Sequence, residues 1–260
     1  MGNREGRSEQ ILKELLREGN VTVDGLVASL GASPASIRRD LTALVSRGLV
    51  RRTYGGAELL EPLLYEPFRY DSSFLGREQH RATEKRKIGL AAAELIQEGE
   101  TVGFTAGTTT TQAARAIRHR ERITVVTNAV NICMELCNCP GLKTYVTGGY
   151  SQWAGSFSLV GQVAIKSLRD VFMDKAFIAV RGIDAERGAS LIEPDEAITF
   201  RTMIEQAKKV IILADSTKIG LVDPALICPP GDINMLITDT DASDEATAPF
   251  LAKGIEVLRV

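Results

Sequence analysis

The sequence of 260 residues lacks any long apolar segment. Apolar runs such as residues 210–214 and 235–237 end after a few positions, far short of the ~20 residues that cross a bilayer. The first residues, Met1-Gly2-Asn3-Arg4-Glu5, are charged and contain no apolar stretch, so we expect no secretory signal. These absences indicate a cytoplasmic protein with no membrane-spanning part.

Cysteine and histidine are also scarce, with four and two residues. Cys133, Cys137 and Cys139 lie close together around an expected helix, whereas His80 and His119 are distant from them in the sequence. A cytoplasmic location argues against disulfides, and a zinc site would need a fourth ligand. We therefore expect buried, reduced cysteines, and we expect no bound metal and no other cofactor.

The formal net charge of -2 hides an uneven distribution. Residues 1–57 contain nine Lys or Arg against six Asp or Glu, whereas residues 58–260 contain 22 against 27. A basic small segment ahead of an acidic larger one is typical of a DNA-binding domain joined to a ligand-binding domain. A split of this size also arises by chance, so it supports other observations and does not stand alone.

Three short helices are predicted near the N-terminus. Apolar residues at helical spacing predict them over residues 8–18, around residues 26–30 and over residues 34–47. The turn before the third helix reads Gly31-Ala32-Ser33-Pro34, with Ser33 as a predicted N-cap and Pro34 at the first helical position. Two short helices joined by a glycine-containing turn indicate a helix-turn-helix.

The third helix and the segment after it carry the predicted DNA contacts. In a helix-turn-helix the second helix of the pair enters the major groove with its N-terminal residues nearest the bases. Residues 49–57 predict a β-ribbon with a glycine pair at its tip, which is a wing. A small helical domain with solvated arginines is the alternative, and the ordered set of cap, helix and ribbon favours DNA binding over it. The candidate DNA-binding residues are Ser33, Ala35, Ser36, Arg38, Arg39, Arg51, Arg52, Tyr54 and Gly55.

The rest of the chain predicts an α/β domain after a linker. Residues 58–83 are rich in Pro, Glu, Tyr and Arg and lack sustained periodicity. From residue 84 onward, helical and strand patterns alternate, which predicts a mostly parallel sheet. The expected helices cover residues 84–97, 109–118, 129–138, 159–169, 195–207 and 243–253, and the expected strands 100–106, 123–128, 143–149, 176–184, 210–215, 234–238 and 255–260. We thus expect a winged helix-turn-helix in residues 1–57, a linker in 58–83 and an effector-binding domain in 84–260.

Polar loops follow several of the expected strands, and ligands bind parallel sheets beyond the carboxyl ends of their strands. A glycine and a run of threonines at the start of a helix suit a phosphate, although no Gly-Lys pair marks a Walker A loop. Each loop alone is also consistent with ordinary caps and turns. Together they predict a pocket for a small phosphorylated sugar or polyol. Its candidate residues are Gly107, Thr108, Thr109, Thr110, Thr127, Asn128, Gly148, Gly149, Asp215 and Lys218.

Ordered blocks along nearly the whole chain resemble the DeoR family of bacterial sugar-metabolism regulators. They are residues 36–41, 48–52, 55–57, 107–110, 127–129, 148–149, 175–177, 182–184 and 215–220. Phe74, Arg77 and residues 84–88 look like the hinge of the family into its sensor domain. The resemblance implies an operator DNA as partner, a phosphosugar effector and a sensor domain similar to the ribose-5-phosphate isomerase fold.

Two residues depart from the pattern of the family. Thr105 stands where the family often has an aspartate, and Arg181 stands where it usually has a small or polar residue. Both changes make the predicted pocket more positive, so Arg181 joins the candidate effector-binding residues and the effector is expected to be more anionic than usual. In the alternative, Arg181 pairs with Glu193, Asp195 or Glu196.

The predicted function is sequence-specific transcriptional regulation, with repression taken from the resemblance. A pseudo-palindromic operator needs two DNA-binding heads at a fixed spacing, so we expect a homo-oligomer, a dimer or tetramer. A structural protein explains neither the wing nor the strand-end loops. A phosphosugar isomerase is the competing class, but the DNA-binding head serves no purpose in one. Its acid, base and enediolate-stabilising groups would come from Asp184, Glu193, Asp195, Glu196, Asp215 and Lys218.

Overall fold

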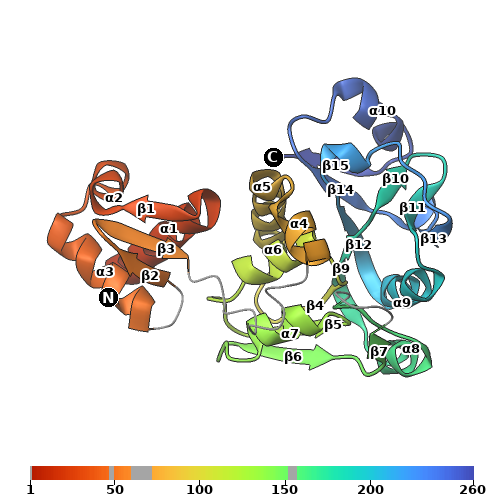
Figure 1. The fold of residues 1–260 in the computed structure, drawn as a ribbon, viewed down its shortest axis with the longest axis horizontal. Coiled ribbons are helices and arrows are strands. Elements are labelled where there is room, and N and C mark those ends of the chain that lie inside the picture. Colours follow the sequence, from red (N-terminus) through yellow and green to blue (C-terminus); the bar gives the residue numbers. More distant parts are fainter. Residues whose placement is uncertain (1, 47–49, 60–71, 152–156) are drawn as a thin grey trace. The chain divides into compact units, whose positions relative to one another are not determined.

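The computed structural model of the chain describes residues 2–46, 50–59, 72–151 and 157–260. The chain forms two compact units, Met1–Phe68 and Arg69–Val260. Figure 1 shows the elements of both units along the chain. Each unit has its own sheet and its own buried residues, so each is described by itself.

The smaller unit contains three helices and a three-stranded antiparallel sheet. The three predicted helices and the predicted ribbon are confirmed. A short strand ahead of the second helix also pairs with the ribbon, in the order β1-β3-β2. The elements are α1 (Gly2–Glu18), β1 (Asn20–Thr22), α2 (Val23–Leu30), α3 (Pro34–Ser46), β2 (Val50–Thr53) and β3 (Gly56–Leu59).

Local hydrogen bonds fix the turn between α2 and α3, and one ion pair ties α3 to α1. Gly31 ends α2 in the left-handed region at φ 61°, which favours glycine. The Ser33 hydroxyl accepts the Ser36 N–H at 3.3 Å, as predicted for an N-cap. Asp40 on α3 is buried and pairs with Arg7 on α1 at 2.6 Å. The helix-turn-helix is therefore held by a cap, a turn and a partly buried charge pair as well as by its apolar residues.

The larger unit is built on a seven-stranded sheet in which all neighbouring strands are parallel, which confirms the predicted α/β fold. The strand order is β15-β14-β12-β9-β4-β5-β6. The strands are β4 (Thr101–Phe104), β5 (Ile123–Thr127), β6 (Leu142–Val146), β9 (Met173–Ala179), β12 (Ala207–Leu213), β14 (Met235–Thr238) and β15 (Glu256–Arg259).

The order of these strands reverses between β4 and β9. From β4 the chain moves outward through β5 to β6, and it then returns to add β9, β12, β14 and β15 on the other side of β4. Because parallel crossovers are right-handed, the reversal puts the helices of the two halves on opposite faces. Figure 1 shows α6 (Thr108–Ala116) and α7 (Val130–Leu136) on one face and α9 (Pro194–Glu205) on the other.

Several further elements were not predicted. The expected strand 176–184 is two strands, because the chain leaves the parallel sheet after β9 and the Arg181 N–H bonds to the Ser190 carbonyl at 3.1 Å. A helix, α4, lies inside the segment predicted as a linker. The additional elements are α4 (Ser72–Gln79), β7 (Tyr150–Ser151), β8 (Leu159–Val160), β10 (Gly182–Asp184), β11 (Gly188–Leu191), β13 (Ala225–Cys228) and two short 3-10 turns at Ser216–Lys218 and Pro230–Asp232. The remaining helices are α5 (Ala82–Glu94), α8 (Gln162–Arg169) and α10 (Asp244–Ala252).

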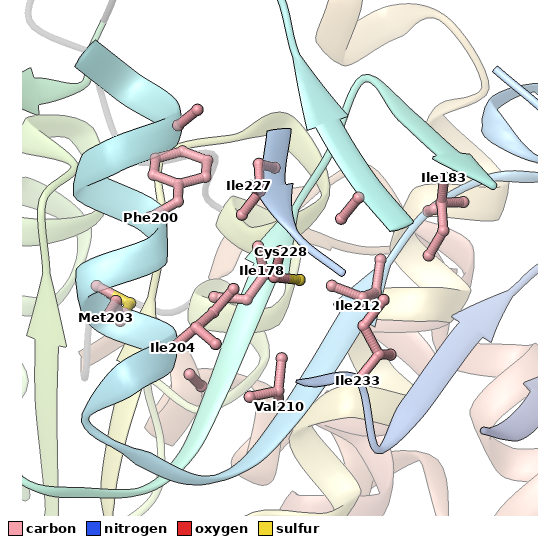
Figure 2. Packing of buried hydrophobic residues seen from close by; sticks show 14 of the residues in the cluster. Ile178, Ile183, Phe200, Met203, Ile204, Val210, Ile212, Ile227, Cys228 and Ile233 are labelled. Carbon is pink, nitrogen blue, oxygen red and sulfur yellow. The ribbon is translucent and has the colours of Figure 1, made fainter. Parts of the chain in front are cut away.

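Apolar side chains fill both faces of the parallel sheet. Figure 2 shows Phe200 and Ile204 of α9 packed toward Ile178 and Ile212 of the sheet, with residues of β13 beside them. On the opposite face the rings of Phe104 and Phe177 stack at 5.2 Å. Successive strand residues point to opposite faces, so Phe177 and Ile178 anchor the two layers from one strand.

The cysteines are only partly as expected. All four are free, Cys139 and Cys228 are buried, and Cys133 is half-buried. Cys137 is exposed, so the expectation of burial is wrong there, because the helix ends at Leu136 and Cys137 is its C-cap. In the described parts of the chain, no three His, Cys, Asp or Glu side chains are grouped to hold a metal ion. No helix within those parts combines the length and apolarity that a membrane span requires.

The close packing of α5 on α6 gives a test of the fold. A Cβ atom added to Gly89 on α5 would lie 2.7 Å from the backbone of Gln112 on α6. We expect Gly89→Ala to destabilise the larger unit by about 1–3 kcal/mol, the usual cost of overpacking. Urea unfolding followed by circular dichroism measures the loss. Gly231→Ala is the control, because its added Cβ meets nothing within 4 Å, and equal stability of the two variants would contradict the packing.

Candidate functional site

The larger unit has a pocket of about 450 Å³ at the carboxyl ends of three neighbouring strands. Residues 106–109 follow β4, residues 179–181 close β9, and residues 213–215 close β12. These strands flank the reversal in strand order between β4 and β9. A crevice forms at such a point because the loops on either side turn toward opposite faces of the sheet, and ligands of open α/β sheets bind there.

Small residues hold the ends of β4 and β9 together. A Cβ atom on Gly107 would lie 2.2 Å from the Cβ atom of Ala179, so only glycine fits at this position. The Thr105 hydroxyl accepts the Ala179 N–H at 2.9 Å. Thr105 is fully buried and does not line the pocket. Its hydroxyl therefore fixes the floor of the crevice and leaves the chemistry of the pocket to other residues.

The N-terminus of α6 opens into the pocket. Gly107 is its N-cap and has no side chain to satisfy the first N–H groups of the helix. Thr108 and Thr109 line the pocket, whereas the Thr110 hydroxyl donates to the Thr105 carbonyl at 2.7 Å and the Thr111 hydroxyl to the Gly107 carbonyl at 2.7 Å. Free N–H groups at the positive end of a helix dipole suit an anion.

Six of the predicted effector-binding residues come together in this pocket: Gly107, Thr108, Thr109, Arg181, Asp215 and Lys218. They follow β4, β9 and β12, the three central strands of the sheet. Lys218 is partly exposed. Asp215 is buried, and its carboxylate accepts the Thr217 N–H at 3.1 Å. These six residues therefore lie at one crevice, at the carboxyl ends of parallel strands where ligands of such sheets bind.

The other five predicted residues do not line it. Thr110, described above, and Thr127 are buried, and the Thr127 hydroxyl donates to the Phe104 carbonyl at 2.7 Å. The Asn128 side chain accepts the Ala106 N–H at 3.1 Å and donates to Ser158, so it shapes the loop after β4. Gly148 and Gly149 lie after β6, the edge strand, where they pack against residues of β8 and α8. Thr127 ends β5, Asn128 follows it and the glycine pair follows β6, and these strands are one and two places away from β4.

The pocket also contains polar residues that the sequence analysis did not assign to effector binding, although it named Glu193 and Glu196 as possible partners of Arg181 and as groups of an isomerase. One wall comes from α4 and the turn after it, and Lys85 reaches in from α5. Glu193 and Glu196 come from the start of α9. Arg77 and the block that contains Lys85 resembled a family hinge, but no periodicity or strand end marked them as part of a site. The additional polar residues are Arg77, His80, Lys85, Glu193 and Glu196.

Burial perturbs two charged groups in the pocket. It lowers the pKa of Lys85, although the nearby Asp215 carboxylate acts in the opposite direction. Burial raises the pKa of Glu196, against the effects of a hydrogen bond with Ser158 and the charge of Arg77. The pocket therefore holds both an ammonium and a carboxyl group whose charged forms are poorly solvated, and a ligand of suitable charge would stabilise them.

Arg181 lines the pocket and is half exposed. Its Nε donates to the Asp223 carboxylate at 3.3 Å. The acidic partner is thus Asp223 and not one of the three acidic residues that the sequence suggested. Asp195, one of those three, instead accepts the Tyr150 hydroxyl at 2.8 Å. An exposed pair at this distance is weak, so the guanidinium can turn to a ligand at small cost.

In the smaller unit, the outer face of α3 carries the predicted base-reading residues. Ser33, Ala35, Arg38 and Arg39 are exposed, and Ser36 is half-buried. The guanidinium of Arg39 folds back along its own helix, with Nη2 3.3 Å from the Ser36 hydroxyl. A shallow hollow of about 390 Å³ follows this face and is lined by Arg38, Arg39, Thr42, Ala43 and Ser46.

The wing presents its two arginines differently. Arg51 lies opposite Glu58 across the ribbon and donates to it from Nε at 2.6 Å. Arg52 is exposed and has no ion-pair partner within the described residues. Tyr54 is fully exposed at the tip, next to Gly55 at φ 84°. Because Arg51 is already neutralised by Glu58, Arg52 is the freer of the two charges.

A winged helix-turn-helix joined to an α/β unit with a polar pocket is the architecture of a DNA-binding regulator with a sensor domain. Comparison with protein families agrees. Residues 7–62 match the DeoR-like helix-turn-helix domain, and residues 80–240 match the DeoR C terminal sensor domain. The chain belongs to the DeoR family, which confirms the resemblance seen in its sequence. It is a DNA-binding transcriptional regulator and not an isomerase with a fused head.

Relatives match over nearly the whole chain. The HTH-type transcriptional repressor GlcR of Bacillus subtilis is 34% identical over 98% of this chain and 95% of its own length. The HTH-type transcriptional regulator GlpR of Haloferax volcanii is 30% identical over 97% and 96%. Among solved structures, ribose 5-phosphate isomerase A of Methanocaldococcus jannaschii matches with a TM-score of 0.38 and 16% identity over 52% of each chain.

The raised pKa of Glu196 predicts a pH-dependent stability. An acid whose pKa is higher in the folded state contributes stability below its unfolded pKa and loses it as the pH rises through the folded value. We therefore expect Glu196→Gln to raise the Tm relative to the unmodified chain at neutral pH, and the difference to vanish near about pH 4. Calorimetry over this pH range measures it. Glu186→Gln, at an exposed side chain, should show no such trend, and a constant difference for Glu196→Gln would contradict the burial argument.

Proposed function

We propose that the chain is a cytoplasmic repressor whose affinity for operator DNA is lowered by a phosphorylated sugar in the pocket. The pocket at the reversal between β4 and β9 carries this proposal. Its position and its anion-binding groups belong to the domain that the family comparison describes as a sensor. Repression follows the relative GlcR, whose name describes a repressor.

The phosphate group would lie at the N-terminus of α6. Thr108 and Thr109 offer hydroxyls and free backbone N–H groups there, and Lys85 and Lys218 add positive charge from two other elements. Backbone donors at a helix N-terminus bind phosphates without the glycine-lysine pair of a Walker A loop. This arrangement supports a phosphate more than it supports an uncharged sugar.

The sugar itself would use the carboxyl groups. Asp215, Glu193 and Glu196 line the same pocket and can accept hydrogen bonds from hydroxyls. A volume of about 450 Å³ lies within the range of pockets for small ligands. The combination of anion-binding donors and hydroxyl-binding acceptors supports a polyhydroxylated monophosphate or a relative with a second anionic group.

The control of DNA binding would act through an oligomer. A regulator of this type reads two half-sites with two recognition helices, so its subunits must associate at a fixed spacing. An effector that binds the DNA-competent and DNA-free states with different affinity shifts the balance between them, typically by about 1–3 kcal/mol. We therefore propose a homo-oligomer that loses affinity for its operator when the sugar phosphate binds.

The DNA contacts can be tested on sites selected by the purified protein from random-sequence DNA. We expect Arg38→Ala to weaken binding by about 1–3 kcal/mol and to relax the preferred sequence, because it removes a base contact. Arg52→Ala should lower the affinity for all DNA sequences alike, because it removes a phosphate contact. For the same reason it should reduce the slope of log affinity against log salt concentration by about 1. Fluorescence anisotropy over a range of salt concentrations measures both effects.

A matched control for the two DNA-binding variants is Arg17→Ala. Arg17 is an exposed arginine on α1 that pairs with Glu18, so its loss should leave affinity and salt slope unchanged. Wild-type affinity and sequence preference in Arg38→Ala would exclude α3 as the reading helix. A normal salt slope in Arg52→Ala would exclude the wing contact.

The effector can be tested with ribose 5-phosphate, glucose 6-phosphate, 6-phosphogluconate and fructose 1,6-bisphosphate. If Arg181 binds a second anionic group, Arg181→Ala should weaken the last two about tenfold, or about 1.4 kcal/mol, and leave the monophosphates unchanged. Asp223→Asn is the complementary variant, because it frees Arg181 from its partner. It should raise the affinity for the same two ligands. Titration calorimetry measures the affinities. If each ligand binds the wild type and both variants with equal affinity, Arg181 does not bind the effector.

A further inference from the structure

Helix α4 forms one wall of the pocket and is the helix of the larger unit that lies nearest in sequence to the wing. Gly76 and Arg77 belong to it, and His80 follows directly after it. β3 of the DNA-binding unit ends at Leu59, and α4 begins at Ser72. Along the chain, α4 is therefore the first described element of the larger unit after the DNA-binding unit.

Two sets of contacts outside the pocket hold α4 to the sensor unit, one around Glu78, which also accepts a hydrogen bond from Gln112 at 3.4 Å, and one around Phe74. Arg115 on α6 donates from Nη1 to Glu78 at 2.5 Å and from Nε to Glu135 of α7 at 2.9 Å. The Phe74 ring packs edge-on against Phe157 with 4.8 Å between the ring centroids. None of these residues lines the pocket, so a ligand would leave both sets of contacts in place.

A third contact lies inside the pocket. The Lys85 ammonium donates to the Arg77 carbonyl oxygen. That carbonyl belongs to the last turn of α4, where carbonyl groups lack partners within the helix. Lys85 thus caps the C-terminus of α4 and adds a positive charge where the helix dipole favours one. An eight-residue helix has little stability of its own, so such a cap matters to it.

We infer that Lys85 couples the pocket to α4, because an anionic ligand competes with the Arg77 carbonyl for the Lys85 ammonium. Hydrogen bonds between two charged groups are stronger than those to a neutral carbonyl. The ligand also places negative charge near the C-terminal end of α4, where the helix dipole disfavours it. Ligand binding therefore loosens α4 and alters the chain that leads to the DNA-binding unit. This coupling rests on the proposed function, since it assumes an anionic effector in this pocket.

Two lysines of the same pocket allow a matched comparison. Lys85 and Lys218 both line it, but only Lys85 caps α4. Lys85→Met should resemble the ligand-bound state. Without sugar, its operator affinity should equal that of the wild type saturated with sugar. Adding sugar to Lys85→Met should lower its operator affinity no further. Lys218→Met should bind the sugars named above more weakly but release DNA fully at saturation. Full operator affinity in Lys85→Met, or the same loss in Lys218→Met, would overturn the coupling.

Glu78→Gln is a second variant that leaves the pocket intact. It weakens one of the anchors of α4 outside the pocket, the ion pair with Arg115. We expect lower operator affinity without sugar, as in Lys85→Met, and a higher sugar affinity by titration calorimetry, because the variant and the ligand favour the same loosened state of α4. Operator affinity equal to that of the wild type would argue against α4 as the responsive element.

Amide hydrogen exchange of the full-length protein tests the cap without any effector. Residues 72–80 of Lys85→Met should exchange about twofold to fivefold faster than in the wild type, the range for a charge lost at a helix end. Helix α10 is the internal reference and should not change, which also shows that the variant is folded. Millimolar inorganic phosphate should produce the same acceleration in the wild type. Unchanged exchange of residues 72–80 in Lys85→Met would refute the inference. If residues 72–80 exchange faster in Lys85→Met but none of the sugars releases DNA, the proposed effector is wrong, whereas the capping of α4 by Lys85 is supported.

Discussion

The approach of β4 to β9 is the constraint on which the larger unit depends. Gly107 leaves no room for a Cβ atom beside Ala179, and the Thr105 hydroxyl ties the two strand ends together. Because the strand order reverses at this point, the loops that follow turn to opposite faces and leave a crevice. The same glycine begins α6 without a side-chain cap, so one residue permits the strand contact and opens the helix N-terminus.

The sequence predicts the elements of this unit well, because apolar periodicity depends only on local spacing. Residues such as Gly107 and Lys218 could be assigned to the pocket because each lies in the loop that follows a strand. The order of the strands is not a local property. The sequence analysis therefore assigned Gly148 and Gly149 to the pocket on the same grounds as Gly107 and Lys218. Only the structure shows that β6 is an edge strand, which places that glycine pair away from the reversal.

Lys85 and α4 escaped prediction for a related reason. They precede the first strand of the sheet, so the rule that ligands bind at strand ends does not reach them. The short length of α4 and the proline-rich stretch before it also hide its helical pattern. Thr105 is the opposite case, a residue that the sequence analysis linked to the pocket but that does not line it. That position suggested a change in the charge of the pocket, but it holds a buried hydroxyl with a structural hydrogen bond. Of the two departures from the family pattern, only Arg181 therefore lines the pocket.

The energies at α4 match what a ligand switch needs. Coupling between two sites is typically worth about 1–3 kcal/mol. A charged group at a helix end contributes about 0.3–1 kcal/mol, and up to about 2 kcal/mol when it is partly buried. Lys85 is buried and acts on a helix of eight residues, so gain or loss of its single contact falls within that range. The apolar layers around Phe104 and Phe200 are fully buried and too stable to respond to one small ligand. The short helix α4 is therefore the element that a ligand of this size can move.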